Sequence, residues 1–438
     1  MSAVRRYHLG LDWGTSTTKM ILRDYEQGRA FVLMHDGGIP TYRYPSSIVL
    51  SDDRIFFGFE AEKRRQEAER AIDALKADIY NKALTHAGGT SMSELEDIAT
   101  LYLAHAISLG RNFAETHAKR DNARALIGIT LGVPAEELEQ SAFRQIYMRM
   151  VRCAYELAMH TGYSPQGDSY SHAQKGLAWA RERVETNGGY EATPDSYKQW
   201  LRPELAAAMY WGIKSPQIQK DLYSCIDIGA WTTNASYFRI HSRLGSAEKD
   251  SIIFFGGQTG GPGVIKLLTE IASDHGQHFI SLFGHEERWL CGSGCSEHID
   301  NFKEGCFKVW KEGFRKAYQL EPRQDAWDGR VNVMVVGGGS KIPAVKKHFI
   351  KSFPHSGWQP GPSVPDLGMP SDLYNFPDQG TIPRQPFKGD YTFLLVAYGL
   401  SVHSGDFPHT TLSPQVPPFD PQSRRPTPLD PEDLGYDV

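Results

Sequence analysis

Two short stretches of the sequence combine residue types that hold a metal ion and a phosphate group. The pattern is Asp, any residue, Gly, two residues and Thr-Thr, and it occurs at 12–18 (DWGTSTT) and 227–233 (DIGAWTT). Glycine lets the backbone approach a phosphate closely, while backbone N–H groups and threonine hydroxyls donate to its oxygens. The aspartates would hold Mg²⁺ through its waters, because Mg²⁺ dehydrates reluctantly. Two facing copies would therefore grip a metal-bound di- or triphosphate.

Strands are expected to position both copies. Apolar runs at 7–11 and 223–228 lead into the two turns, and returning strands are expected at 19–23 and 234–240. A single copy is common in plain hairpins, but two copies placed after strands favour a ligand site. Further strands are expected at 45–50 and 55–57, in the same sheet as the first turn, and at 126–133, 252–255 and 331–336. The second part of the chain thus repeats the plan of the first.

Helical patterns separate these strands. A charged helical tract is predicted from about residue 60 to 83, and Ser93 and Glu96 have the spacing of a capping box that opens a second helix. We expect both helices in an inserted subdomain at about 58–118. After Pro134, apolar residues recur every three or four positions from Leu138 to Leu157, which is typical of an amphipathic helix. The polar stretch 164–200 predicts an irregular insertion.

Length and composition limit the class of protein. The chain has 438 residues, 40% hydrophobic and 23% charged, which predicts a globular protein of two lobes: 1–213 and 214–403. Residues 404–438 are rich in proline and are expected to be disordered. A net charge of −5 does not indicate the basic surface that nucleic-acid binding requires. Without a signal peptide or a long apolar run, we expect a cytoplasmic protein with no membrane span.

The five cysteines are odd in number and irregularly spaced, so reduced thiols are expected. Cys291, Cys295, His298 and Cys306 are zinc-compatible residue types. Their spacing matches no zinc module, which favours plain thiols over a metal site.

The motifs together resemble the superfamily of ATPases that includes actin, sugar kinases and the heat-shock protein 70 chaperones. The segments 9–15 (LGLDWGT) and 225–232 (CIDIGAWT) look like its two phosphate motifs, and 336–343 (VGGGSKIP) resembles the adenosine motif of the chaperones. Three shorter matches, 133–135 (VPA), 203–208 (PELAAA) and 396–399 (VAYG), follow the family's order. The resemblance implies an α/β, two-lobed actin-like fold of duplicated ribonuclease H-like domains, with ATP or ADP and Mg²⁺ in the cleft.

The resemblance also assigns roles to residues. Those expected at the nucleotide are Gly14, Thr15, Ser16, Lys19, Gly229, Thr232, Gly337, Gly338, Gly339 and Lys341. Asp12 and Asp227 would organise the magnesium and its waters. Lys76 lies near where the chaperones keep a catalytic lysine, and Lys19 is the alternative because actin and the sugar kinases have a lysine at that spacing.

The positions at which this sequence departs from the family's motifs bear on whether ATP is hydrolysed. Asn234 stands where the chaperones have an aspartate, and Ala230 and Trp231 replace glycines of the second turn. The chaperones read Glu-Pro before their alanines, whereas this chain reads Arg202-Pro203-Glu204, so Glu204 polarises the attacking water only if the register slips. Nucleotide binding is therefore expected, and fast hydrolysis is not.

Four functions remain open. The favoured one is a slow Mg-ATP-dependent conformational switch of the heat-shock protein 70 type, acting on a protein partner of unknown identity. The chain ends about 35 residues after the last family motif, so we expect no peptide-binding domain of the chaperone kind. The alternatives are an actin-like filament former, a small-molecule kinase and a nucleotide-binding scaffold that does not hydrolyse. The sequence leaves the oligomeric state open.

Overall fold

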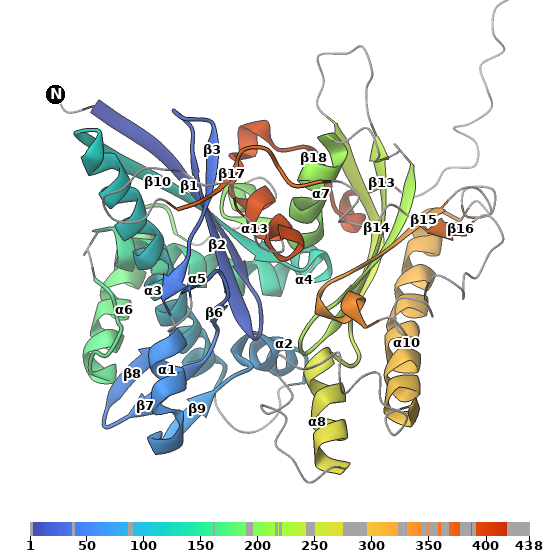
Figure 1. The fold of residues 1–438 in the computed structure, drawn as a ribbon, viewed down its shortest axis with the longest axis horizontal. Helices are drawn as coiled ribbons and strands as arrows, with labels where there is room; N and C mark the ends of the chain where they lie inside the picture. The colour runs from blue at the N-terminus through green and yellow to red at the C-terminus, as the bar shows by residue number, and fades with distance from the viewer. Residues whose placement is uncertain are drawn as a thin grey trace, which may run out of the picture.

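The computed structural model describes residues 3–36, 40–85, 91–160, 163–189, 196–214, 218, 221–241, 250–274, 296–322, 327, 331–342, 349, 358–360, 368–376, 387 and 391–417. The protein is α/β, as expected, and two large sheets dominate it (Figure 1). In the described part of the chain, we find no helix that is both long and apolar enough to cross a membrane.

The first sheet contains the first Asp-x-Gly turn. Its main path has the order β11-β10-β1-β2-β3-β17, and β6 (Tyr44–Pro45) pairs with β2 beside this path. The strands of the path are β1 (Ala3–Trp13), β2 (Thr17–Asp24), β3 (Arg29–Val32), β10 (Ala123–Val133), β11 (Leu201–Pro203) and β17 (Leu373–Asn375). The turn therefore joins β1 to its antiparallel neighbour β2.

The second sheet contains the second turn in the same place. Its order is β16-β15-β12-β13-β14-β18. The strands are β12 (Leu222–Ile228), β13 (Thr233–His241), β14 (Ser251–Gly260), β15 (Val331–Val336), β16 (Trp358–Pro360) and β18 (His409–Thr411). In both sheets the strand before the turn pairs antiparallel with the strand after it and parallel with a later strand. The repeat seen in the sequence is thus a repeat of strand order and direction.

Strand patterning explains how the second sheet is buried on both faces. Tyr223 and Cys225 of β12 belong to the core that this sheet shares with the first sheet, whereas Leu222, Ile226 and Ile228 face a separate core. Successive side chains of a strand point to opposite faces, so one alternating run supplies both. The separate core packs against α8 (Val264–Asp274) and α10 (Ser296–Leu320).

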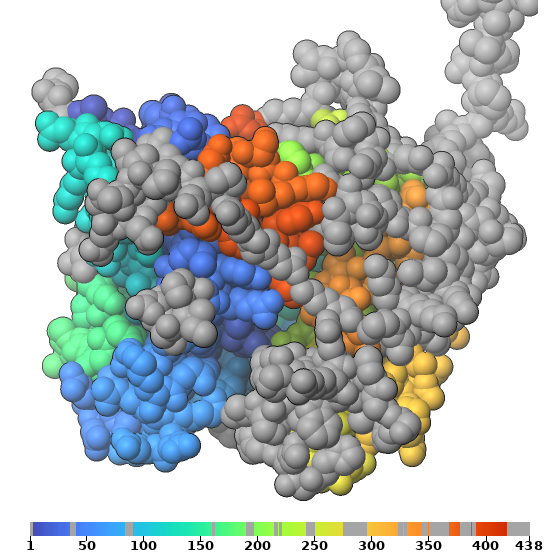
Figure 2. Space-filling model, in the orientation of Figure 1, coloured from blue at the N-terminus to red at the C-terminus, as the bar shows by residue number. Residues whose placement is uncertain are grey.

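Two helices connect the sheets. α7 (Glu204–Lys214) follows β11, and α13 (Leu395–Leu400) packs against both α7 and β1. The contact is close because both faces use glycine: a Cβ on Gly399 would lie 1.9 Å from the carbonyl oxygen of Ala207, and one on Gly10 would lie 2.3 Å from that of Ala397. The space-filling view shows the red and orange C-terminal elements directly against the blue first sheet (Figure 2).

The region expected to be an inserted subdomain divides into two parts. β7 (Ile48–Ser51), β8 (Arg54–Phe57) and β9 (Arg70–Ile72) form a separate small sheet beside α1 (Gly58–Arg64) and η1 (Arg65–Glu67). Our assignment of 45–50 and 55–57 to the first sheet is therefore wrong, except for Pro45 in β6. The helical tract predicted at 60–83 is broken by β9 and resumes as α2 (Leu75–Thr85).

The long helix α3 (Met92–Arg120) belongs to the core of the first sheet. Its residue Gly110 lies against Leu9 of β1, where an added Cβ would come within 2.4 Å of a Leu9 methyl carbon. Placing this helix in an insertion was wrong, because its buried residues cover the sheet. The cap also differs from the expected Ser93: Ser91 accepts from the Glu94 N–H.

Three further helices follow β10 in the sequence. α4 (Ala135–Glu139) and α5 (Ser141–His160) follow β10, as the apolar pattern after Pro134 predicts. The stretch 164–200, expected to be irregular, contains the helix α6 (Tyr170–Thr186), which packs on α5. The polar composition of α6 misled the prediction because only a narrow stripe of it, including Leu177 and Val184, is buried.

The C-terminal segment is structured as far as residue 417. β18 pairs in parallel with β14, η8 (Ser404–Asp406) precedes it, and η9 (Ser413–Gln415) follows it. Phe407 and Leu412 are buried. The expectation of disorder is therefore wrong for 404–417, because two apolar side chains and one strand edge order this stretch. Residues 418–438 lie outside the described residues.

Candidate functional site between the two sheets

The two Asp-x-Gly turns have the same local geometry. The N–H of Gly14 donates to the Thr17 carbonyl at 3.2 Å, and the N–H of Gly229 donates to the Thr232 carbonyl at 2.9 Å. Each aspartate also pairs across its hairpin with the residue seven positions later: Asp12 with Lys19, and Asp227 with Asn234. The turns are therefore equivalent in backbone and unequal in charge, since a lysine in one corresponds to an amide in the other.

Glycines make the turns and their surroundings compact. A Cβ on Gly14 would lie 2.7 Å from the Thr17 carbonyl oxygen. Gly337, which has a φ of +78°, lies so close to Asp227 that a Cβ there would come within 2.2 Å of its Oδ1. Gly339 packs likewise on Ile228. The glycine-rich segment expected at the nucleoside thus lies directly beside the second aspartate, in η5 (Gly338–Lys341).

Two lysines of the first-sheet side lie at the first turn, and one of them pairs with Asp12. The Lys19 ammonium lies 3.0 Å from Asp12 Oδ2. Lys76 of α2 is 8% exposed, and its Nζ donates to the Trp13 carbonyl at 3.0 Å and to Glu204 Oε1 at 2.5 Å. Lys76 and Glu204, 128 positions apart in the sequence, therefore meet at the first turn. Burial alone would lower the pKa of Lys76, but Glu204 and Glu137 outweigh it and raise the pKa above its ordinary value.

The same charged groups also shift the pKa of Asp227. Burial, reinforced by Glu204 and Asp12, raises the pKa of Asp227 to about 7, although Lys19 and Lys76 act in the opposite direction. The geometry agrees, because Glu204 of the first-sheet side and Asp227 of the second sheet line the same small cavity, and Lys76 joins Glu204 to the Trp13 carbonyl, next to Asp12. The catalytic residues expected from the sequence, Asp12, Asp227, Lys76 and Glu204, therefore converge between the sheets.

A small cavity of about 20 Å³ lies beside these carboxylates. Glu136 and Glu204 line it from one side, and Asp227, Asn234 and Thr259 line it from the other. This volume holds about one water molecule. The cavity places room for water next to the one carboxylate, Glu204, that the resemblance connects with water activation.

Three polar atoms in the two turns are buried without a hydrogen-bond partner. They are Ser16 Oγ in the first turn and Trp231 Nε1 and Asn234 Oδ1 in the second. Leaving such an atom unsatisfied costs about 1–3 kcal/mol, so each of the three is available to a ligand placed at the turns. Together with the two aspartates and the bare backbone of Gly337, these donors and acceptors fit a metal-bound phosphate group.

The remaining expected residues are placed as follows. Thr15, Ser16, Gly229 and Thr232 lie in the turns and are partly buried, and Gly338 is exposed. Lys341 ends η5, but its side chain lies outside the described part of the structure.

The structure describes two of the four zinc-compatible residues, His298 and Cys306. Cys291 and Cys295 lie outside the described residues. Cys306 lies 3.3 Å from the Thr233 hydroxyl, and His298 pairs with Asp274 at 2.6 Å. Within the described ranges, no group of three or more His, Cys, Asp or Glu side chains is arranged to hold a metal by itself. Asp12 and Asp227 would accordingly hold Mg²⁺ only together with water and phosphate oxygens.

Sequence reasoning missed Glu137 of α4. This residue is 2% exposed and accepts a 2.5 Å hydrogen bond from the Tyr147 hydroxyl. The motif at 133–135 is part of the family resemblance, and the two glutamates that follow it could have pointed to a carboxylate here. Nothing in the sequence separates a buried glutamate from a solvated one at the start of a helix.

Comparisons with known proteins add no family. The sequence matches no protein-family model, and no curated protein matches it.

Proposed function

We propose that the chain binds Mg-ATP between its two sheets and acts as a slow nucleotide-dependent conformational switch, in a two-lobed fold of the actin and heat-shock protein 70 type. The observation that carries the proposal is the convergence of Asp12, Asp227, Lys76 and Glu204 at two turns of equal geometry. A ligand held from both sheets favours one arrangement of them over others, and this differential binding is what makes a switch.

The chain's own residues suit a triphosphate. Lys19 and Lys76 supply positive charge at the first turn, where phosphate oxygens carry negative charge. Ser16 and Trp231 each offer a polar atom without a partner. Bound Mg²⁺ would supply charge neutralisation for the phosphates. Glu204, beside the small cavity, would orient a water molecule there.

A non-hydrolysing scaffold is the second candidate. Glu204 is already held by Lys76 at 2.5 Å, and a carboxylate oxygen that accepts from an ammonium is less available to a water molecule. Asn234 adds no charge on the other side of the cavity. Slow phosphate release is expected under the first proposal and none under the second.

Thermal unfolding tests nucleotide binding directly. Mg-ATP should raise the melting temperature, since a ligand at 100 times its Kd adds about 2.7 kcal/mol to the free energy of unfolding. Asp12→Ala and Asp227→Ala should abolish this rise, because each removes a carboxylate of the site. Asp300→Ala, an exposed site on α10, is the control and should keep it. An unchanged melting temperature of the unaltered chain at millimolar Mg-ATP would refute the proposal.

A further inference from the structure

One serine holds two backbone carbonyls of the first Asp-x-Gly turn. The Ser46 hydroxyl donates to the Gly14 carbonyl at 2.7 Å, and the Ser46 N–H donates to the Ser16 carbonyl at 2.9 Å. Ser46 directly follows β6 and is 3% exposed. A carbonyl can only accept, so the single proton of the Ser46 hydroxyl is committed to Gly14. Ser46 therefore fixes the orientation of two peptide units in the turn.

A buried network of hydroxyl groups holds Ser46 in turn. Its Oγ lies 3.2 Å from Thr18 Oγ1, which lies 2.7 Å from the Tyr102 hydroxyl of α3. The Tyr102 hydroxyl also donates to the Pro45 carbonyl at 3.1 Å. Thr18 and Tyr102 are completely buried. The last threonine of the first motif thus bonds within the protein, where it supports Ser46.

The second turn is held in an equivalent way by the start of α8. The Val264 N–H donates to the Gly229 carbonyl at 3.0 Å. The last threonine of the second motif, Thr233, is again completely buried, and its hydroxyl donates to the Pro262 carbonyl at 2.7 Å. In both turns the carbonyl of the motif glycine is therefore held from the protein side, by a side-chain hydroxyl in one and by a backbone N–H in the other.

Holding a glycine carbonyl determines where the next N–H points, because the C=O and N–H of a trans peptide unit point in opposite directions. The Gly14 carbonyl is directed at Ser46, so the Thr15 N–H is directed away from it. By the same argument, the Ala230 N–H is directed away from Val264. Neither N–H donates to a backbone carbonyl within the described part of the chain. Backbone N–H groups of this kind are donors for phosphate oxygens.

We propose that Ser46 is a positioning residue of the phosphate site, which keeps the Thr15 N–H directed toward the phosphates by holding the Gly14 carbonyl. Without the hydroxyl, this carbonyl loses its donor. Because glycine permits a wide range of backbone angles, the peptide unit after Gly14 can then rotate. A rotated unit presents its carbonyl oxygen where an anion needs an N–H. The inference rests on the proposed function.

Ser46→Ala tests this role, because it removes the hydroxyl and keeps the N–H bond to Ser16. The variant should bind Mg-ATP about tenfold more weakly by titration calorimetry, since one donor to a charged group is lost. Ser108→Ala is the matched control. Ser108 of α3 is 1% exposed, and its hydroxyl donates to the carbonyls of Ala104 and Tyr163 at 2.8 and 2.9 Å. Both variants should lower the melting temperature without ligand, but Ser108→Ala should change the Mg-ATP Kd less than twofold.

Amide hydrogen exchange measures the turn itself. The Gly14 N–H donates to the Thr17 carbonyl at 3.2 Å, so its exchange rate reports how often the turn opens. Without ligand, this amide should exchange about tenfold faster in Ser46→Ala than in the unaltered chain. Ser108→Ala should leave the rate unchanged.

The outcomes separate this inference from the proposed function. An unchanged Mg-ATP Kd in Ser46→Ala, or an equal loss of affinity in Ser108→Ala, would overturn the positioning role while nucleotide binding stands. If the unaltered chain binds no Mg-ATP, the proposed function fails, and the exchange rate of the Gly14 amide decides whether Ser46 holds the turn.

Discussion

At the scale of single residues, the two turns differ most at one position. Lys19 and Asn234 occupy the same place in their hairpins, so the first aspartate has an ammonium beside it and the second has an amide. The unpartnered Asn234 Oδ1 and the raised pKa of Asp227 both lie at this second turn. This difference in charge is the reason why the proposed function includes slow hydrolysis.

Asn234→Asp should accelerate phosphate release on the order of tenfold, because a further carboxylate, beside those of Glu204 and Asp227, then faces the water cavity. The same change places like charges side by side and should lower the melting temperature of the chain without ligand. Single-turnover phosphate release and thermal unfolding measure the two effects. Asn234→Ser, which is uncharged, is the control, and equal rates in both variants would show that charge at this position is irrelevant.

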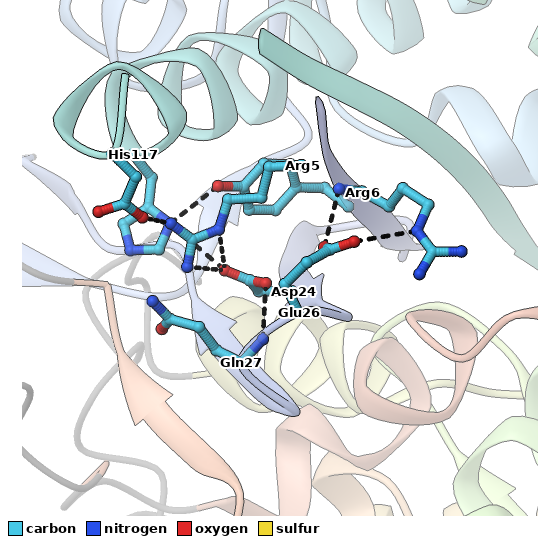
Figure 3. Close-up of polar contacts among 8 residues, drawn as sticks. Arg5, Arg6, Asp24, Glu26, Gln27 and His117 are labelled. Carbon is cyan, nitrogen blue, oxygen red and sulfur yellow. Dashed lines mark hydrogen bonds and ion pairs between the residues drawn. The ribbon is translucent and has the colours of Figure 1, made fainter. Parts of the chain in front are cut away.

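At the scale of elements, a buried ionic cluster fixes the end of the β1–β2 hairpin opposite the turn. The Arg5 guanidinium lies 2.7 Å from Asp24 Oδ2, and the Tyr7 hydroxyl lies 3.0 Å from His117 Nδ1 of α3 (Figure 3). Asp24 is completely buried. The cluster ties both strands to α3 and so holds the hairpin that presents Asp12.

Asp24→Ala should lower the free energy of unfolding by about 3 kcal/mol, because it removes the buried one of the two carboxylates that pair with Arg5 and leaves only the half-exposed Asp121. The neighbouring Arg6–Glu26 pair, also visible in Figure 3, is exposed and provides the control. Glu26→Ala should cost only about 0–1 kcal/mol. Urea unfolding compares the two, and similar losses would contradict the importance of burial.

At the scale of the whole molecule, Glu136 joins the two sheets beside the site. Its Oε1 lies 2.9 Å from Lys316 Nζ of α10, and its Oε2 accepts from the Thr259 N–H of β14. The Tyr80 hydroxyl of α2 donates to the Thr259 carbonyl at 3.3 Å. Both backbone polar groups of Thr259 in the second sheet are thus hydrogen-bonded to side chains of the first-sheet side, which helps to hold the two sheets in the observed arrangement.

Glu136→Ala should shift the chain toward more open arrangements and weaken Mg-ATP binding about tenfold, because affinity falls with the fraction of competent molecules. Small-angle scattering should show a larger radius of gyration without nucleotide. Lys303→Ala breaks an ion pair within α10 and should alter neither quantity. An unchanged Kd and radius in Glu136→Ala would mean that apolar packing alone holds the sheets together.

Local patterns were sufficient for much of this fold. The apolar runs before Asp12 and Asp227 and the returning strands were predicted close to their observed positions, because alternation and glycine turns are properties of neighbouring residues. Predictions failed where distant partners decide: β7 pairs with β8 and β9 instead of the first sheet, and β18 is ordered by the edge of β14.

The sequence by itself determined the two phosphate-type turns, their repetition and the inequality of Lys19 and Asn234. Only the tertiary structure decided that Lys76 bonds to Glu204 and that Glu204 and Asp227 line one small cavity. The physical reason is the distance along the chain over which each feature is decided. Hairpin geometry depends on residues a few positions apart, whereas the raised pKa of Asp227 and the bond between Lys76 and Glu204 depend on groups that only folding brings together.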